Sequence, residues 1–183
     1  MKKFAGALLL SAAISTPALA GDVGTFYGGI DMGTWAMSNT GFPNPGMFRV
    51  TGGYRFAPNL SGELGIAGAG ESVICDGAGC LIYNQGALTL AAVGTFPVNN
   101  QFDLFGKVGV SSISGKLTGT GWYAGTYAKE STGNLMFGFG GQFNFNKKVG
   151  LRLQYESLGK SKSDPAATGV DVTVTSLGVY YNF

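Results

Sequence analysis

Apolar residues alternate with polar or small residues at a period of two through almost the whole chain after residue 20. Because successive side chains of a β-strand point to opposite faces, each alternating segment predicts a strand with one apolar and one polar row. There are eight such segments, each close to the ~9–11 residues that a strand needs to cross a bilayer. They cover residues 26–34, 48–56, 60–66, 85–96, 102–110, 135–145, 149–156 and 172–183.

The connections between these segments are alternately short and long. Such a pattern is typical of an up-and-down meander in which one rim is plain and the other is elaborated. We therefore expect an all-β fold, an eight-stranded antiparallel up-and-down barrel. The short connections are residues 57–59, 97–101 and 146–148, and the long ones are residues 37–46, 72–83, 116–132 and 161–169.

The first twenty residues have the features of an export signal. Lys2 and Lys3 form a basic start, residues 4–14 are mostly apolar, and the small residues of 18–20 form a cleavage site. The apolar stretch is shorter than the ~18 residues that a spanning helix needs, which argues against an uncleaved anchor. We therefore expect residues 1–20 to be a cleaved signal peptide and residues 21–183 to form one barrel domain.

Composition removes several classes of function. The chain contains no histidine, which excludes Ser-His-Asp hydrolysis, Cys-His chemistry and histidine metal sites. Without Lys2 and Lys3, ten basic residues balance ten acidic ones, so nothing indicates a nucleic-acid partner. Because no residue is placed to act as a catalytic base, we expect no enzymatic activity, no catalytic residues, no cofactor and no metal.

The two cysteines, Cys75 and Cys80, enclose four residues, of which two are glycine. Glycine lets so small a ring close without steric conflict, and export to an oxidising compartment favours a disulfide. Two free thiols are the alternative. A disulfide here would tighten one loop and would have no redox role.

Alternation does not decide which row faces the barrel interior. A soluble carrier of the lipocalin type would have the apolar row inside, whereas a membrane barrel has it outside. The other row is rich in glycine and small polar residues, which suit a narrow lumen. Aromatic residues also gather on the apolar row beside the short connections and chain ends, as an interfacial girdle requires. They are Phe26, Tyr54, Phe56, Phe96, Phe102, Phe143, Phe145, Tyr181 and Phe183.

The eighth segment departs from the pattern, because Val172 and Val174 fall on its polar row. A β-bulge or the end of the membrane zone are the two explanations.

Trp35, Trp122 and Tyr123 lie near the rim of long connections. We expect them in the outer girdle or in loop packing rather than as ligand contacts.

Five stretches resemble the OmpA-like family of transmembrane barrels: residues 25–33 (TFYGGIDMG), 50–66, 96–109, 140–157 and 177–183 (LGVYYNF). The last resembles the C-terminal recognition signal for outer-membrane assembly, formed by Leu177, Val179, Tyr181 and Phe183. The resemblance implies a monomer in the cell outer membrane, in contact with its lipid, lipopolysaccharide and assembly machinery. We expect no periplasmic domain after the barrel, as in the small OmpX-type and opacity-type barrels.

The family carries charged residues inside its barrel. Glu63 and Arg152 match an acid and a base of that cluster, and Lys107 replaces an arginine. Asp31 reverses the charge of a family lysine. Two further family charges correspond here to Val93 and Gln142, so one ionic pair is retained and a second is lost. This departure argues against a gate that switches between two pairs.

Asp31, Glu63, Lys107 and Arg152 are thus two acids and two bases, which we expect to pair because isolated charges in a narrow barrel are costly. An eight-stranded barrel is just wide enough for its side chains to fill it, so a structural plug is favoured over a gated ion path. Arg49 and Arg55 lie nearer strand ends and are expected at the rims.

Two functions remain open from the sequence. The first is a structural or surface-interaction role, adhesin-like, in which the four long connections meet a host or cell-surface ligand. The alternative is a small, low-conductance pore that the interior charges gate or plug.

Overall fold

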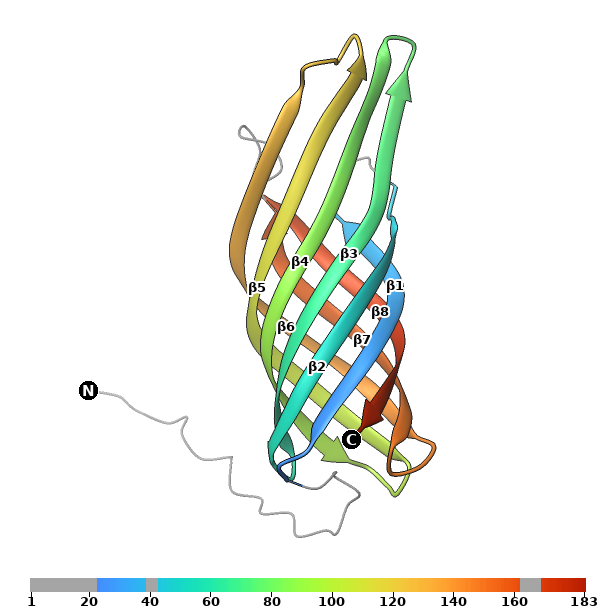
Figure 1. Cartoon of the computed structure of the whole chain (residues 1–183), viewed down its shortest axis with the longest axis vertical. Coiled ribbons are helices and arrows are strands. Elements are labelled where there is room, and N and C mark those ends of the chain that lie inside the picture. Colours follow the sequence, from blue (N-terminus) through green and yellow to red (C-terminus); the bar gives the residue numbers. More distant parts are fainter. Residues whose placement is uncertain (1–22, 39–42, 162–168) are drawn as a thin grey trace, which may run out of the picture.

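The two rows of each alternating segment separate as the sequence predicts. The computed structural model describes residues 23–38, 43–161 and 169–183. Each strand pairs antiparallel with the next, and the last pairs with the first, so the sheet closes into an eight-stranded barrel (Figure 1). The strands are β1 (Phe26–Met37), β2 (Gly46–Ala57), β3 (Leu60–Asp76), β4 (Gly79–Pro97), β5 (Phe102–Gly121), β6 (Tyr127–Asn144), β7 (Val149–Ser161) and β8 (Val170–Asn182).

The apolar row faces outward, which excludes a soluble barrel with an apolar lining. Met32 and Leu135 are 69% and 77% exposed, whereas charged residues such as Glu63 are buried inside. The aromatic residues predicted for the girdle also point outward near the short connections; Phe102 is half-buried and the rest are exposed. The outer surface therefore has the apolar band with aromatic residues at one rim that a bilayer requires.

Four neighbouring strands extend well beyond the other four. β3, β4, β5 and β6 have 17 to 20 residues each, whereas β1, β2, β7 and β8 have 12 or 13. Figure 1 shows the long strands rising as a projecting sheet at the end opposite the C-terminus. The strands are thus longer than the apolar alternation alone indicates, because the ladder continues past the apolar band.

Two of the predicted long connections are therefore wrong. In residues 72–83 the strand continues to Asp76 and restarts at Gly79, and in 116–132 only residues 122–126 separate the strands. Outside a membrane both faces of a strand meet water, so the apolar row that marks a strand disappears although the hydrogen-bonded ladder continues. Connections 37–46 and 161–169 lie partly outside the described residues.

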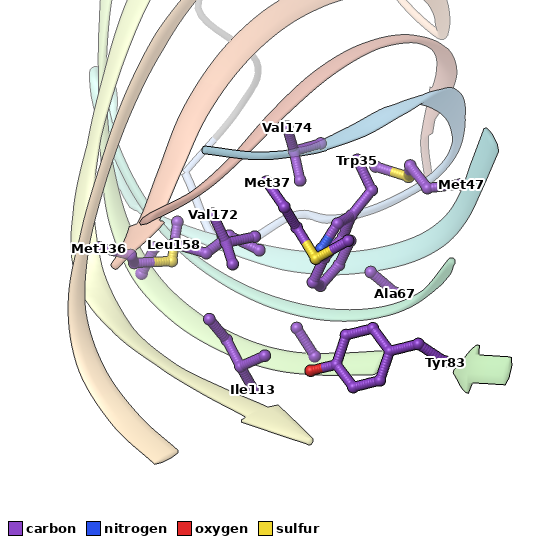
Figure 2. Close-up of a cluster of buried hydrophobic side chains, with 12 residues drawn as sticks. Trp35, Met37, Met47, Ala67, Tyr83, Ile113, Met136, Leu158, Val172 and Val174 are labelled. Atoms are coloured by element: carbon purple, nitrogen blue, oxygen red, sulfur yellow. The ribbon is translucent and has the colours of Figure 1, made fainter. Parts of the chain in front are cut away.

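An apolar layer fills the barrel near the base of the projecting sheet. All eight strands contribute to it, and Figure 2 shows its side chains converging. Trp35 and Val172 in this layer are fully buried. Its members are Trp35, Met37, Met47, Ala67, Tyr83, Ala87, Ala91, Ile113, Met136, Leu158, Val172 and Val174.

This layer explains the irregular alternation of β8. Val172 and Val174 lie on the interior row, and the pairing of β8 with β1 continues without a shift from Asn182 to Val172. The interior is therefore apolar at this level, whereas the outward row carries Asp171 and Thr173. The one register shift at this level lies in β7, between Ser157 and Gly159, and the end of the membrane zone stays a prediction. The prediction that Trp35 belongs to the outer girdle is also wrong, because this side chain lies inside.

Within the part of the chain that the structure describes, no helix is long and apolar enough to cross a membrane.

Two adjacent glycines of β2 provide a test of interior packing. The Cβ position of Gly53 overlaps the buried Tyr27 ring, whereas that of Gly52 has no atom within 4 Å. We expect Gly53→Ala to lower the free energy of unfolding by about 1–3 kcal/mol through overpacking. Gly52→Ala is the matched control and leaves it nearly unchanged. Urea unfolding in lipid vesicles measures both, and equal losses would contradict this packing.

Candidate functional site

Six charged side chains form one chain of alternating sign across the middle of the barrel. Their order is Asp31, Arg49, Glu156, Lys107, Glu63 and Arg152, and neighbours in this order are ion-paired. The distances are 3.0 Å for Arg49 Nε to Asp31 Oδ2, 2.5 Å for Lys107 Nζ to Glu63 Oε2 and 3.2 Å for Lys107 Nζ to Glu156 Oε1. Three acids thus balance three bases, and we call this set the ionic chain.

The structure brings three of the four predicted charges into direct contact. Glu63 lies between Lys107 and Arg152 and accepts from both. Asp31 joins them only through two residues that the sequence analysis left out of the cluster, Arg49 and Glu156. The expected pairing of acids with bases is therefore present, with a longer set of partners.

Arg49 was expected at a rim, and that prediction is wrong. Its side chain is 3% exposed, and its guanidinium pairs with both Asp31 and Glu156. Strands in a barrel are tilted and staggered, so the depth of a residue depends on register as well as on its distance from the strand end. In the ladder Arg49 lies directly opposite Asp31.

Glu156 is the acid that sequence reasoning missed. It lies on the polar row of β7 four residues after Arg152, so the two side chains point into the same lumen. The Glu156 carboxylate is the second ion-pair partner of Lys107. Gln142 accepts two hydrogen bonds from the Arg152 guanidinium, at 3.0 and 3.3 Å. The alternation of β7 already places Glu156 on the same row as Arg152.

Neutral groups complete the ionic chain. The Tyr27 hydroxyl donates to Glu63 Oε1 at 3.1 Å, and Gln154 donates to Asp31 Oδ1 at 3.1 Å. Arg49 Nη2 donates to the Ser176 hydroxyl at 3.1 Å. Buried charges are tolerated when they are paired and their remaining hydrogen-bonding groups are also satisfied, as here.

The interior beside the ionic chain is nearly solid. Cavities next to Tyr27 and Asp31, and next to Tyr83 and Ile113, have volumes of about 10 Å³ each. Such a volume holds about one water molecule. The ionic chain and the apolar layer therefore fill the middle of the barrel, and a cavity of about 310 Å³ lies at the short-turn end.

The tips of the projecting sheet are joined to each other. Cys75 and Cys80 form a disulfide at the β3–β4 turn. Asp76 accepts hydrogen bonds from the backbone N–H groups of Ala78 and Gly79 and, at 2.6 Å, from the Tyr123 hydroxyl of the neighbouring tip. These contacts add to the β4–β5 ladder, which continues to Gly79 and Gly121, and so hold the two hairpins as one surface.

The last strand carries the predicted assembly signal on its outer face. Leu177, Val179 and Tyr181 are exposed on the lipid side of β8, and Phe183, just after it, is 76% exposed. A recognition signal must be accessible to the assembly machinery, and these side chains are accessible on the outer face of the barrel. Its use in assembly stays a prediction, as does cleavage of residues 1–20, which lie outside the described residues.

An apolar exterior with an aromatic girdle and a closed, ion-paired interior together define a small integral membrane barrel. Residues 6–183 match the family model described as outer membrane protein beta-barrel domain, and the chain belongs to this family. Its place is therefore the outer membrane. Short turns of such barrels face the periplasm, so the projecting sheet faces the cell exterior.

Several solved structures share this fold. Neisserial surface protein A has a TM-score of 0.69 at 16% identity, with 86% of this chain and 97% of that chain covered. Ail of Yersinia pestis, solved in complex with the heparin analogue sucrose octasulfate, has 0.63 at 21% identity, with 88% and 100% covered. OprG of Pseudomonas aeruginosa has 0.61 at 14% identity, with 91% and 99% covered. At these identities the likeness extends to the fold alone. No curated protein sequence matches the chain.

The ionic chain predicts a large and local stability effect. Glu63→Ala leaves two buried cations without their shared partner, and we expect a loss of about 3–5 kcal/mol in unfolding free energy. Glu71→Ala, an exposed acid on the same strand, is the control and should change it by less than about 0.5 kcal/mol. Urea titration in lipid vesicles measures both, and similar midpoints for the two variants would argue against the ionic chain.

The joined tips predict a pKa change. The hydrogen bond from the Tyr123 hydroxyl holds the pKa of the Asp76 carboxyl below its ordinary value and raises the pKa of the Tyr123 phenol. Because the folded pKa of Asp76 is depressed, this stabilisation is present above the ordinary pKa and is lost as the pH falls through the folded value. Tyr123→Phe should therefore raise the pKa of Asp76, as a carboxyl carbon NMR titration can measure. Tyr127→Phe, on the same hairpin, should leave it unchanged.

Proposed function

We propose that this outer-membrane barrel is a surface-interaction protein and that its projecting sheet binds a protein ligand on another cell or surface. The observation that carries the proposal is the unequal strand length. Four strands extend beyond the barrel into the exterior, while the barrel below them is closed. A protein of this shape offers surface outside the cell rather than a passage through the membrane.

The projecting sheet has open edges. Within the described part of the chain, residues 127–136 of β6 have no ladder partner in β7, and residues 73–76 of β3 have none in β2. The Asn134 side chain still bonds the backbone of Lys160 in β7, and no ladder pair between the described residues of β6 and β7 lies beyond Phe137 and Ser157. Exposed edges pair readily with an extended segment of another protein.

Apolar side chains are exposed on the same sheet. Trp122 is 87% exposed at the tip of the β5–β6 hairpin, and Tyr127 is 63% exposed at the start of β6. Val73 and Ile74, beside the disulfide, are also exposed. Aromatic side chains dominate the binding energy of many protein interfaces, so these residues supply anchors for a ligand.

The joined tips give this surface a defined shape. The disulfide closes one tip, and the Trp122 backbone N–H donates to the carbonyl of Ala78 in the other hairpin at 2.9 Å. A surface held in one conformation loses less entropy on binding than a flexible loop does. This rigidity supports a binding role for the sheet.

The filled interior supports this proposal over a low-conductance pore. Charges in a conducting path need water around them, whereas the ionic chain is paired throughout and the cavity beside Asp31 and Arg152 has a volume of about 10 Å³. Planar bilayer recordings are the direct comparison. Regular current steps that Glu63→Ala alters would favour the pore, and silence from a folded barrel would favour the surface role.

Loss of the aromatic anchor should reduce binding. On the surface of a non-adherent bacterial strain, we expect Trp122→Ala to lower adhesion to host cells or matrix proteins about tenfold, the effect of losing an interface anchor. Val98→Ala truncates a residue that is 52% exposed at the short-turn rim, and it should change nothing. Heat-modifiable gel mobility confirms that both variants fold.

Two outcomes of the adhesion assay would count against this proposal. Adhesion that survives Trp122→Ala combined with Tyr127→Ala would exclude the tip as the binding surface. Adhesion that soluble heparin abolishes would point instead to the cationic pair of Lys116 and Lys129, which lie opposite each other on β5 and β6.

A further inference from the structure

The lipid-facing side of the barrel is not smooth. An open groove of about 500 Å³ crosses the outer face of β5, β6 and β7 and reaches Thr175 of β8. Its walls are almost entirely apolar. The side chains that form them belong to the outward rows of these strands: Phe102, Leu104, Phe139, Phe143, Leu151, Leu153 and Tyr155.

Gly141 produces the depression in this face. In the ladder it pairs with Leu104 of β5 on one side and with Leu153 of β7 on the other, so a residue without a side chain separates two leucines. Along β6 it lies between Phe139 and Phe143, which are 63% and 39% exposed. The outer face is therefore low at Gly141 and raised on four sides.

The groove lies in the half of the apolar band that is nearer the short turns. The outward apolar row of β6 runs from Leu135 to Phe145, and the groove occupies its part from Phe139 to Phe143. This part extends roughly 14 Å along the strand, a length comparable with the ~15 Å depth of one leaflet. Short turns face the periplasm in barrels of this family, so the groove faces the periplasmic leaflet, which consists of phospholipid. Its shape and surroundings favour an acyl chain.

A cationic turn lies at the short-turn end of the groove. Lys147 and Lys148 are exposed residues of the turn that joins β6 to β7, and these two strands carry most of the groove walls. The other two short turns, residues 57–59 and 97–101, contain no charged residue. Among the described residues, neither lysine belongs to an ion pair. The exposed positive charge of this rim is therefore concentrated beside the groove.

The ammonium group of Lys148 lies on the outer side of the barrel. Its Nζ is 5.9 Å from the centroid of the Tyr181 ring, and Tyr181 points outward on β8 as part of the aromatic girdle. Val149, which follows Lys148, pairs with Tyr181, and Leu151, two residues further on, lines the groove. A cation at the level of the girdle is at the depth of the lipid headgroups.

We propose that the groove holds an acyl chain of an anionic phospholipid of the periplasmic leaflet and that Lys148 binds the phosphate group of this lipid. The chain covers the depression at Gly141, and the phosphate accepts a charge-assisted hydrogen bond from the Lys148 ammonium group. A headgroup with a net negative charge is favoured over a zwitterionic one, because the turn has two positive charges and no negative one. The site does not depend on the exterior surface proposed above.

A second copy of the chain suits this groove less well than a lipid does. All copies of an outer-membrane barrel have the same orientation, so a symmetric dimer through this face brings the lysine turns of both copies to the same level. Lys147 and Lys148 of both copies would then lie at one rim and repel one another. A lipid instead brings the opposite charge to this turn.

The lipid preference can be measured on the wild-type protein. The glycine-labelled barrel is placed in nanodiscs of phosphatidylcholine with a small share of phosphatidylglycerol or phosphatidylcholine that carries a nitroxide on its acyl chain. NMR line broadening of the Gly141 amide reports the labelled chain. Gly62, on the outward row of β3 beside an uncharged turn, is the internal control. We expect phosphatidylglycerol to broaden Gly141 about fivefold more than phosphatidylcholine does, the enrichment that one surface cation gives, and both lipids to broaden Gly62 equally.

Two results of this measurement would overturn the proposal. A ratio of the two lipids at Gly141 that equals the ratio at Gly62 would show that the groove selects no lipid. Gly141 that is shielded from both labels in nanodiscs with two barrels, but not in nanodiscs with one barrel, would place a second copy in the groove.

A charge-loss pair tests the contact with the headgroup. Lys148→Gln should lower the ratio of the two lipids at Gly141 about fivefold, to the value at Gly62. Lys129→Gln removes an exposed lysine from the exterior end of β6 and should leave the ratio unchanged. Equal ratios in these two folded variants would exclude Lys148 as the headgroup ligand. The comparison of the two lipids needs no variant, so it tests the proposal whether or not Lys148→Gln folds.

Discussion

Paired charge inside a closed barrel is the constraint on which the rest of this structure depends. The ionic chain joins β1, β2, β3, β5 and β7 through five ion pairs, and its acids and bases are equal in number. In the low dielectric of the interior, removing one member leaves a neighbour unpaired at a high cost. The sheet therefore keeps the register that holds these side chains together, with Asp31 directly opposite Arg49.

Glycine residues make room for the large side chains that, with the ionic chain, fill the barrel interior. Tyr27 lies over Gly53 and Tyr180 over Gly150, positions at which any Cβ would overlap the ring. Aromatic rings that cover inward-facing glycines are one means by which barrels close sharply without a void. The narrow lumen is thus packed by pairing large residues with glycines across the ladder, and this packing also leaves little space for water.

Much of this fold is predictable from the sequence, and the exceptions have physical causes. The period of two persists wherever one face of a strand meets lipid, so the eight strands and the three short turns can be located. That signal stops where both faces meet water, which hides the continuation of β3 to Asp76 and of β5 to Gly121. It is also inverted where the interior row becomes apolar and the outward row polar, as at Val172 and its neighbours Asp171 and Thr173.

The charged site was harder to predict, because pairing depends on depth in the barrel. The family resemblance identified Glu63 and Arg152, which are in contact. Sequence position does not contain strand tilt, so it does not predict that Arg49 lies at the depth of Glu156, or that Glu156 meets Lys107. The register between strands of the closed sheet decides which of these residues meet. No single segment of the sequence contains that register.

Because the middle of the barrel is filled, the surfaces at which a water-soluble ligand can bind lie at its two ends. These two surfaces differ in composition. The exterior end presents open strand edges and aromatic side chains such as Trp122, which suit a large ligand held by apolar contact and backbone pairing. The short-turn end presents a cavity of about 310 Å³ whose walls include Arg55 and Asp103. The ionic chain and the apolar layer lie between the two ends of the barrel.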